Sequence, residues 1–426
     1  MVKNNMAIKN IKENELQRES EFKKRMIVFS FLVMYLLAVF FISSVMDVRR
    51  FNIPWALEIP KNCFNIYSSK IHPLVNYPPL IPLILGVIGS FLNFVHISLG
   101  LRGLPFYFLC NGLVKLPSLI GTFAFITWLK KERSSFNGNN WPLVLLLLCS
   151  PALFFNTAIW GQFDVINVIT LFLSFYYLEN KHVKLASFWM AVSLLSKLQA
   201  VYFFPIFVLF LIIHYKFLDY LKSFITGSLT FLVPWFPLMI INHDFFLPIK
   251  LYLNGSGRYL AINDHAFNFW SVFYPYSVKL LPKVNDVYAF GLTFKNLNFL
   301  ILLIILAIIF LMILRFHFDL NEALLMYSLW IFTFTMQQHE RYEIPSLAFI
   351  LLILILKKDR QGNLAYLLIF GALNILIFFN QLNVYLSHAA EISFGNIFVL
   401  ITSIISVCLT IAISVYLVFK DKLETN

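Results

Sequence analysis

The side chains that could do chemistry in this sequence lie mostly at the ends of long apolar stretches. Once the lysines and arginines that mark a cytoplasmic side are set aside, the remaining polar residues gather on the opposite side: Asp47, Asp164, Lys197, Gln199, Arg258, His265, His339 and Arg341. An ionisable group at membrane depth is costly unless it is paired or solvated in a cavity, so such a group first indicates a functional site. The mixture of carboxylates and cations predicts proton transfer beside a bound phosphate.

Two carboxylates occupy positions where a structural and a functional role are both open. Asp47 follows an apolar stretch and precedes a long polar segment, so it either marks the membrane interface or acts as a general base on an attacking hydroxyl. Asp164 ends the sequence Trp160-Gly161-Gln162-Phe163-Asp164, which separates two apolar stretches. Asp164 can cap the next helix through its free N–H groups, and it can bind a ligand at the same time.

Lys197 and Gln199 lie at the end of an apolar stretch that we predict to be external, where positive charge is disfavoured. Lys197 either extends to the membrane surface or binds a phosphate, with Gln199 offering donors beside it. Arg258 is a weaker phosphate candidate in a long loop. The nearby aromatic segment 267–270 forms either an interfacial belt or part of a binding wall.

The segment His339-Glu340-Arg341-Tyr342 again places positive charge outside, between two apolar stretches. Pairing of Arg341 with Glu340 or Glu343 is the structural explanation. The functional explanation is a phosphate site, because arginine binds phosphate through two parallel hydrogen bonds and histidine can donate to an anionic leaving oxygen.

The composition excludes a soluble globular protein. Of 426 residues, 60% are hydrophobic and only 13% are charged, which is too little polar surface for a soluble globule. Apolar stretches of about 18 residues or more recur along the chain, and each can cross a bilayer as a helix. The net charge of +12 comes from residues at the ends of these stretches, so it indicates orientation rather than nucleic-acid binding.

Charge placement predicts an all-α bundle of about twelve spans with both termini in the cytoplasm, by the positive-inside rule. The predicted spans are residues 26–46, 113–129, 141–159, 164–179, 185–200, 203–215, 223–242, 297–314, 322–337, 344–356, 362–380 and 396–419. Residues 80–100 are apolar enough to cross, but crossing there would place most later Lys and Arg pairs outside. We therefore expect a hairpin or surface helix at the outer face.

These elements form one membrane domain, 26–426, behind a cytoplasmic leader, 1–25. The domain includes a first external loop with surface helices, 47–112, and a large external loop, 243–295. The span 26–46 lacks a small-residue cleavage site, which favours a retained anchor over a signal peptide.

An ordered set of motifs resembles the GT-C glycosyltransferases, integral membrane enzymes that use a polyprenyl-phosphate sugar as donor. The set comprises Asp47 after the first span, Tyr77-Pro78-Pro79-Leu80, Trp160-Gly161-Gln162-Phe163-Asp164, Ser196-Lys197-Leu198-Gln199, Phe267-Asn268-Phe269-Trp270 and His339-Glu340-Arg341-Tyr342. The chain is most similar to bacterial mannosyltransferase-like members and more distantly similar to the dolichyl-phosphate-glucose glucosyltransferases.

The resemblance implies a GT-C type fold and an inverting hexosyltransferase in the bacterial plasma membrane, with its site on the external face. Its catalytic base would be Asp47. The residues implied or proposed to bind the donor phosphate are His339, Arg341, Lys197 and Arg258. Those that would hold the sugar or the acceptor are Asp164, Gln162, Trp160, Gln199 and Tyr77. The expected partners are the polyprenyl-phosphate donor, a cell-envelope or lipid-linked glycan and membrane lipid, and no metal or other cofactor is expected.

Two other classes of function remain open. A transporter or flippase of a lipid-linked sugar would bind phosphate with the same cations, and no bond would change. Buried charge on both membrane sides or inverted repeats would favour it, and neither is evident in the sequence. A non-catalytic membrane scaffold would need internal carboxylates to satisfy Lys197 and Arg341.

Overall fold

The computed structural model describes residues 2–132, 140–255, 260–274, 282–289, 291–356, 363–392 and 394–423. Within these ranges the chain is almost wholly helical, so the prediction of an all-α protein is confirmed. The only sheet in the described part is a short antiparallel pair of β1 (Val287–Ala289) and β2 (Leu292–Thr293).

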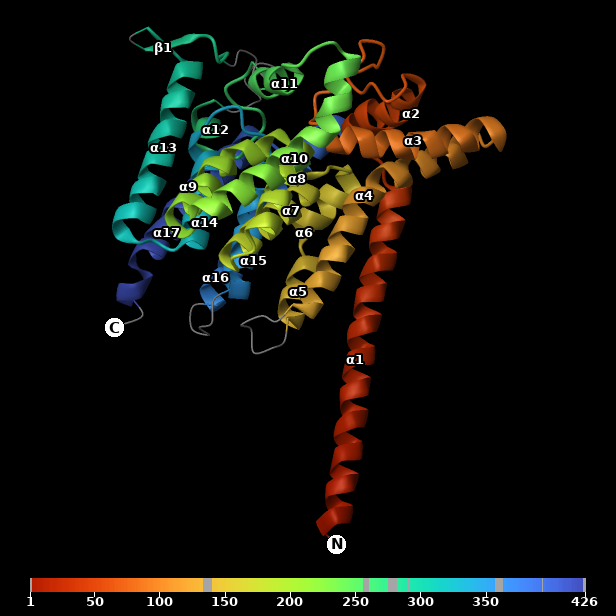
Figure 1. The fold of residues 1–426 in the computed structure, drawn as a ribbon, viewed down its shortest axis with the longest axis vertical. Helices are drawn as coiled ribbons and strands as arrows, with labels where there is room; N and C mark the ends of the chain where they lie inside the picture. Colours follow the sequence, from red (N-terminus) through yellow and green to blue (C-terminus); the bar gives the residue numbers. More distant parts are fainter. Residues whose placement is uncertain are drawn as a thin grey trace.

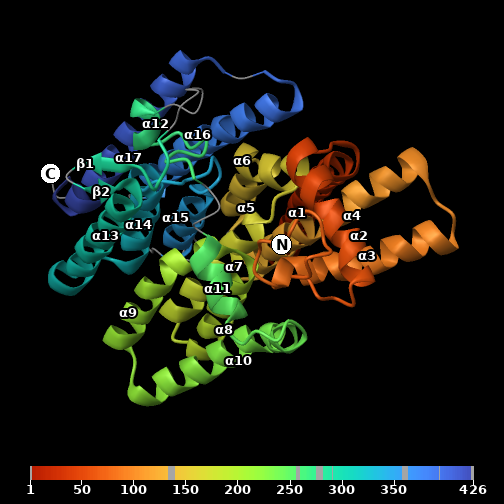
Figure 2. The same ribbon diagram turned by 90° about the horizontal axis from the view of Figure 1, so that it is seen from above.

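The N-terminal part consists of one long helix and a group of helices that cross its upper end. These are α1 (Val2–Phe41), the π-helical turn η1 (Val45–Asn52), α2 (Ile53–Lys61), α3 (Leu80–Ser98) and α4 (Gly103–Lys131). Figures 1 and 2 both show α3 lying crosswise to α1. Helices α2 and α3 pack so closely that a Cβ on Gly89 would lie 1.6 Å from the carbonyl oxygen of Ala56.

The middle of the chain contains a broken helix followed by antiparallel helices. The elements are α5 (Trp141–Leu148), α6 (Pro151–Phe154), η2 (Phe155–Trp160), α7 (Asp164–Glu179), α8 (Val183–Ser196), η3 (Leu198–Phe203), α9 (Phe204–His214), α10 (Phe217–Ile241) and α11 (Leu247–Gly255). The chain bends by 51° between α5 and α6, since Pro151 cannot continue the helical hydrogen bonds. Asn374 stabilises the bend, because its Oδ1 accepts a 2.9 Å hydrogen bond from the Ala152 N–H.

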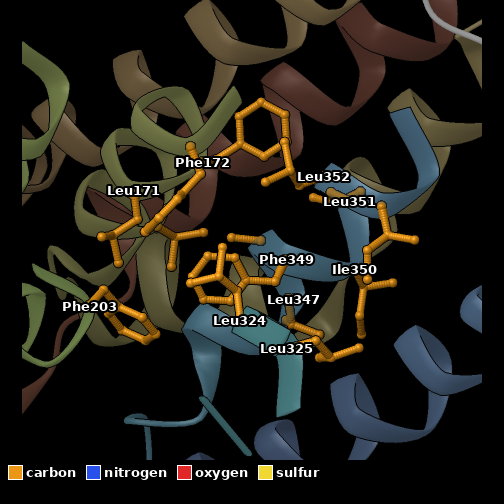
Figure 3. Packing of buried hydrophobic residues seen from close by; sticks show 14 of the residues in the cluster. Leu171, Phe172, Phe203, Leu324, Leu325, Leu347, Phe349, Ile350, Leu351 and Leu352 are labelled. Atoms are coloured by element: carbon orange, nitrogen blue, oxygen red, sulfur yellow. The ribbon is translucent and has the colours of Figure 1, made fainter. Parts of the chain in front are cut away.

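The C-terminal part encloses the most buried helix of the bundle. Its elements are α12 (Phe269–Phe273), α13 (Phe294–Phe316), α14 (Leu320–Phe334), α15 (Ile344–Leu356), α16 (Asn363–Ala389) and α17 (Asn396–Leu423). Helix α15 is apolar on every side and is buried almost throughout, as expected for a helix surrounded by others. Figure 3 shows its Phe349 packed among side chains of the main core, including Leu324 of α14 and Phe203 of η3.

Among the described residues, seven helices are long and apolar enough to cross a membrane, and an eighth span results if the bent α5–η2 pair crosses once. This is compatible with an integral membrane protein. Four further apolar helices have 10–17 residues, so the total of twelve spans remains a prediction. Figure 1 shows both termini toward the same end of the bundle.

Candidate functional site

The site is built around residues 160–164, which we call the knot, where η2 ends and α7 begins. Gly161 makes this turn with a φ of 78°, in the left-handed region. A Cβ there would lie 2.6 Å from Cγ2 of Val48 and 2.9 Å from Cε of Lys115. Glycine is therefore required both by the backbone conformation and by the close approach of two neighbouring elements.

Replacing Gly161 with Ala is expected to destabilise the protein. A left-handed conformation costs a non-glycine residue on the order of 1–3 kcal/mol, and the added methyl group must displace Val48 or Lys115. The apparent melting temperature of the detergent-solubilised protein should fall by several degrees. Gly371→Ala is the matched control, since nothing lies within 4 Å of its added Cβ; equal melting temperatures for the two variants would contradict the expectation.

Asp47 lies in η1, the π-helical turn that follows α1, and is half-buried. The side chain of Ser44 begins this turn by accepting a hydrogen bond from the Asp47 N–H at 3.3 Å. The carboxylate of Asp47 accepts a hydrogen bond from the indole N–H of Trp160. The end of the first apolar stretch and the knot are thus in direct contact, and the carboxylate is oriented by a rigid aromatic side chain.

Asp164 is the common partner of the two cations in the site. Its Oδ1 pairs with Nζ of Lys197, and its Oδ2 lies 3.4 Å from Nε of Arg341. Asn156 of η2 also donates to Oδ2, at 3.1 Å. Asp164 is the first residue of α7, near the positive end of the helix dipole, but its carboxylate bonds to side chains, so it is a buried ion-pair centre.

Arg341 joins the knot to the segment 335–343 between α14 and α15. It pairs with Glu340 as well as Asp164, and its guanidinium carbon lies 5.7 Å from the centre of the Trp160 ring. Internal pairing of Arg341, one of the two explanations open from the sequence, is therefore present. Burial opposes ionisation of Glu340, but Arg341 and His339 more than offset it and hold its pKa well below the usual range.

His339 lies between two carboxylates. Its Nε2 is 3.1 Å from Oδ2 of Asp264, and its Nδ1 is 3.7 Å from Oε2 of Glu340. The backbone of His339 pairs with Asp264 and His265, which brings the large loop against the segment that carries Arg341. Burial raises the pKa of Asp264, although the nearby His339 acts in the opposite direction.

Tyr77 and Gln162 complete the contacts around Lys197. The ammonium of Lys197 lies 6.0 Å from the ring centre of Tyr77 and 5.9 Å from that of Tyr342, within the range of cation–π attraction. The Tyr77 hydroxyl donates to Oε1 of Gln162 at 3.3 Å. Gln199 is buried in η3, and within the described residues no hydrogen bond joins its amide to the others.

The remaining predictions for the large loop have different outcomes. Arg258 lies outside the described residues. The aromatic segment 267–270 packs against the helix bundle. Asn268 caps the start of α12. The indole N–H of Trp270 donates to the carbonyl oxygen of Phe334 at 2.8 Å. The Phe267 N–H donates to Asn380 of α16, so this segment holds the loop onto α14 and α16.

The sequence analysis missed Lys115, a fully buried lysine in α4. Its ammonium donates to the carbonyl oxygen of Ile42 and to those of Ala158 and Ile159, at 2.9 and 3.2 Å. It therefore ties the segment that follows α1 to η2, and its side chain lies against Gly161 of the knot. The sequence did indicate a buried, partnered side chain here, because a single lysine inside an apolar stretch is rare without a partner.

His265 gives the site a pH-dependent stability. Burial lowers its pKa from 6.5 to about 4, against the attraction of Glu340. Between these values the unfolded chain binds a proton that the folded protein does not, so stability is lost as pH falls through this window. Its positive φ of 68° is one that Asn tolerates, which makes His265→Asn a suitable variant.

We expect the melting temperature of the wild type to fall more steeply than that of His265→Asn between pH 6.5 and 4. Thermal unfolding of both proteins across this range measures the difference. Other groups titrate equally in both, so parallel curves would contradict the assignment.

A second buried ion pair lies at the opposite end of α14. Glu322 pairs with Lys420 of α17, and the Tyr366 hydroxyl donates to Glu322 at 2.5 Å. Buried charge on the predicted cytoplasmic side was not evident from the sequence, and this pair supplies it at that end of α14. The two residues are 98 positions apart in the chain, so their pairing cannot be read from local sequence.

The fold and the site together define a helical protein, compatible with an integral membrane protein, that carries a buried ion-pair cluster at one end of its bundle. No protein-family model matches the sequence, and no curated protein matches it. Across the described residues, no group of three or more His, Cys, Asp or Glu side chains is placed to hold a metal ion.

Proposed function

We propose that this protein is a GT-C type glycosyltransferase that moves a hexose from polyprenyl phosphate to a hydroxyl of a cell-envelope or lipid-linked glycan on the non-cytoplasmic face. One observation carries the proposal. A half-buried carboxylate, Asp47, and two cations, Lys197 and Arg341, come from three distant segments and all contact the knot. An acid–base group beside fixed positive charge is what glycosyl transfer from a phosphate requires.

In the proposed reaction, Asp47 takes the proton of the acceptor hydroxyl as its oxygen attacks the anomeric carbon. The bond from that carbon to the phosphate oxygen breaks, and polyprenyl phosphate leaves with the electron pair on the opposite face, which inverts the configuration. Negative charge grows on the leaving phosphate, so Arg341, Lys197 and His339 stabilise it. Donors of this kind in a preorganised site contribute about 2.7–4 kcal/mol each.

Both cations already have carboxylate partners, so a phosphate must use the donors that these pairs leave. An ammonium has three N–H donors and a guanidinium has five. Among the described residues, Lys197 pairs with Asp164, and Arg341 pairs with Glu340 and Asp164. Each cation can therefore hold its carboxylate and a phosphate oxygen at the same time.

An apolar groove next to Lys197 supports a lipid-linked donor. Helices α8, α9 and α10, which lie together in Figure 2, enclose a cavity of about 620 Å³. Its lining includes Leu194, three residues before Lys197, together with Phe207 and Phe224. An isoprenoid tail in this groove would place its phosphate at the Lys197 end.

The proposal includes a membrane topology in which the site lies on the external side. With both termini in the cytoplasm and α3 lying along the outer surface, the knot faces the external side. The charge clusters that the positive-inside rule places in the cytoplasm then agree with twelve spans.

The proposal is tested by incubating the purified full-length protein with a radiolabelled polyprenyl-phosphate hexose and cell-envelope glycan acceptors. We expect release of polyprenyl phosphate together with labelled acceptor. Intact donor after prolonged incubation with every acceptor fraction would reject the transferase.

A transporter of lipid-linked sugars is the second candidate, and the Glu322–Lys420 pair is the observation that favours it. This pair adds buried charge at the other end of the bundle, where a carrier open to both sides would need it. The two functions are separated by proteoliposomes that contain a fluorescent lipid-linked sugar: a transporter moves the label between leaflets without cleaving it.

A further inference from the structure

A second pocket lies behind His339, between the large loop and the upper ends of α16 and α17. Its volume is about 290 Å³, and its polar wall is formed by Asn263, His265, Ser271, Asn383, Ser387, His388 and Asn396. Figure 2 shows α12, which follows this part of the loop, beside α17. Because the backbone of His265 pairs with that of His339, the pocket adjoins the proposed phosphate site.

The pocket lining carries amides, hydroxyls and imidazoles but no carboxylate, lysine or arginine. Phe267 and Phe394 supply apolar rings in the same wall. Burial keeps His265 uncharged near neutral pH by lowering its pKa to about 4. The lining therefore suits a neutral ligand that both donates and accepts hydrogen bonds and has apolar faces, and it does not suit a phosphate.

Asn263 contributes a buried amide to this wall. Asn263 is 1% exposed, and its amide N–H₂ donates to Ser271 and to the carbonyl oxygen of Tyr274. Its Oδ1 has no hydrogen-bond partner among the described residues, whereas buried acceptors are normally satisfied.

We propose that this pocket binds one neutral sugar unit of the acceptor glycan. The inference rests on the proposed function for the identity of the acceptor, and on the pocket itself for the class of ligand. The volume is just below the range of about 300–1,000 Å³ typical of drug-sized ligands, which suits one sugar ring. The sugar could belong to the acceptor or to the donor, and the experiment separates these sources.

The ligand class is tested with methyl glucoside and methyl mannoside by saturation-transfer NMR on the full-length protein. Asn396→Trp should fill the pocket from the exposed start of α17, and we expect it to remove most of the signal. Ile397→Trp is the matched control, because Ile397 is the next residue, is 74% exposed and is outside the pocket lining. Equal signals from these two variants would overturn the site, whether or not the protein is a transferase.

The source of the sugar is tested by kinetics. Asn396→Trp should raise KM for the acceptor at least tenfold, and by a larger factor than KM for the polyprenyl-phosphate donor. An equal or larger rise for the donor would overturn the acceptor assignment. If the wild type transfers no sugar at all, the proposed function fails while the NMR result still decides whether the pocket binds a sugar.

Discussion

Asp47→Asn is expected to lower the rate of sugar transfer by at least about a hundredfold, since general-base catalysis contributes about 10²–10⁴-fold. Asparagine has the same shape and keeps an oxygen that can accept the hydrogen bond from Trp160. It cannot take a proton from the acceptor. Folding and donor binding should therefore be unchanged while turnover is lost, as measured by release of polyprenyl phosphate under single-turnover conditions.

Glu58→Gln provides the matched control for this experiment. Glu58 lies in α2, close to Asp47 in the chain, and pairs with Lys61 near the surface. Its variant should transfer sugar at the normal rate. Near-normal transfer by Asp47→Asn would remove the assignment of Asp47 as the base.

Asp164→Asn is expected to cause the largest loss of stability. The substitution leaves Lys197 buried with a neutral partner and Arg341 paired with Glu340, and breaking a buried ion pair costs about 3–5 kcal/mol. Lys197→Met should cost less, because Asp164 then retains Arg341. The double variant Asp164→Asn with Lys197→Met should be more stable than Asp164→Asn alone, since one buried cation without a charged partner has been removed. Chemical unfolding in detergent micelles measures all three.

Asp219→Asn tests whether the effect comes from burial. Asp219 also pairs with a lysine, Lys222, but at the surface, where such pairs contribute about 0–1 kcal/mol. If Asp164→Asn were as stable as Asp219→Asn and lost only sugar binding, Asp164 would be a ligand-binding group instead of an ion-pair centre.

The helices could be predicted from the sequence because polar residues interrupt the apolar stretches at their ends. The predicted segments 164–179 and 344–356 coincide with α7 and α15. The π-helical turn η1 and the bend at Pro151 could not be predicted in the same way. Pro151 marks a break in the helix, but the contact from Asn374 in α16 that stabilises the bend cannot be read from the local sequence.

The candidate residues of the site could also be chosen from the sequence, but their partners could not. Asp164, Lys197 and Arg341 stood out as ionisable groups beside apolar stretches, yet each had several possible partners. The contact of His339 with Asp264 depends on how the large loop returns to the bundle. Loop paths are set by tertiary contacts, which periodicity and charge counts do not encode.

The buried ammonium of Lys115 has a mechanical consequence. It bonds to the last turn of chain before η1 and to the last turn before the knot, so neither can shift without stretching these bonds. A tilt of the long N-terminal helix would then be transmitted to the carboxylate and to both cations as one rigid movement. A movement of the leader segment would therefore be transmitted through α1 to the proposed site.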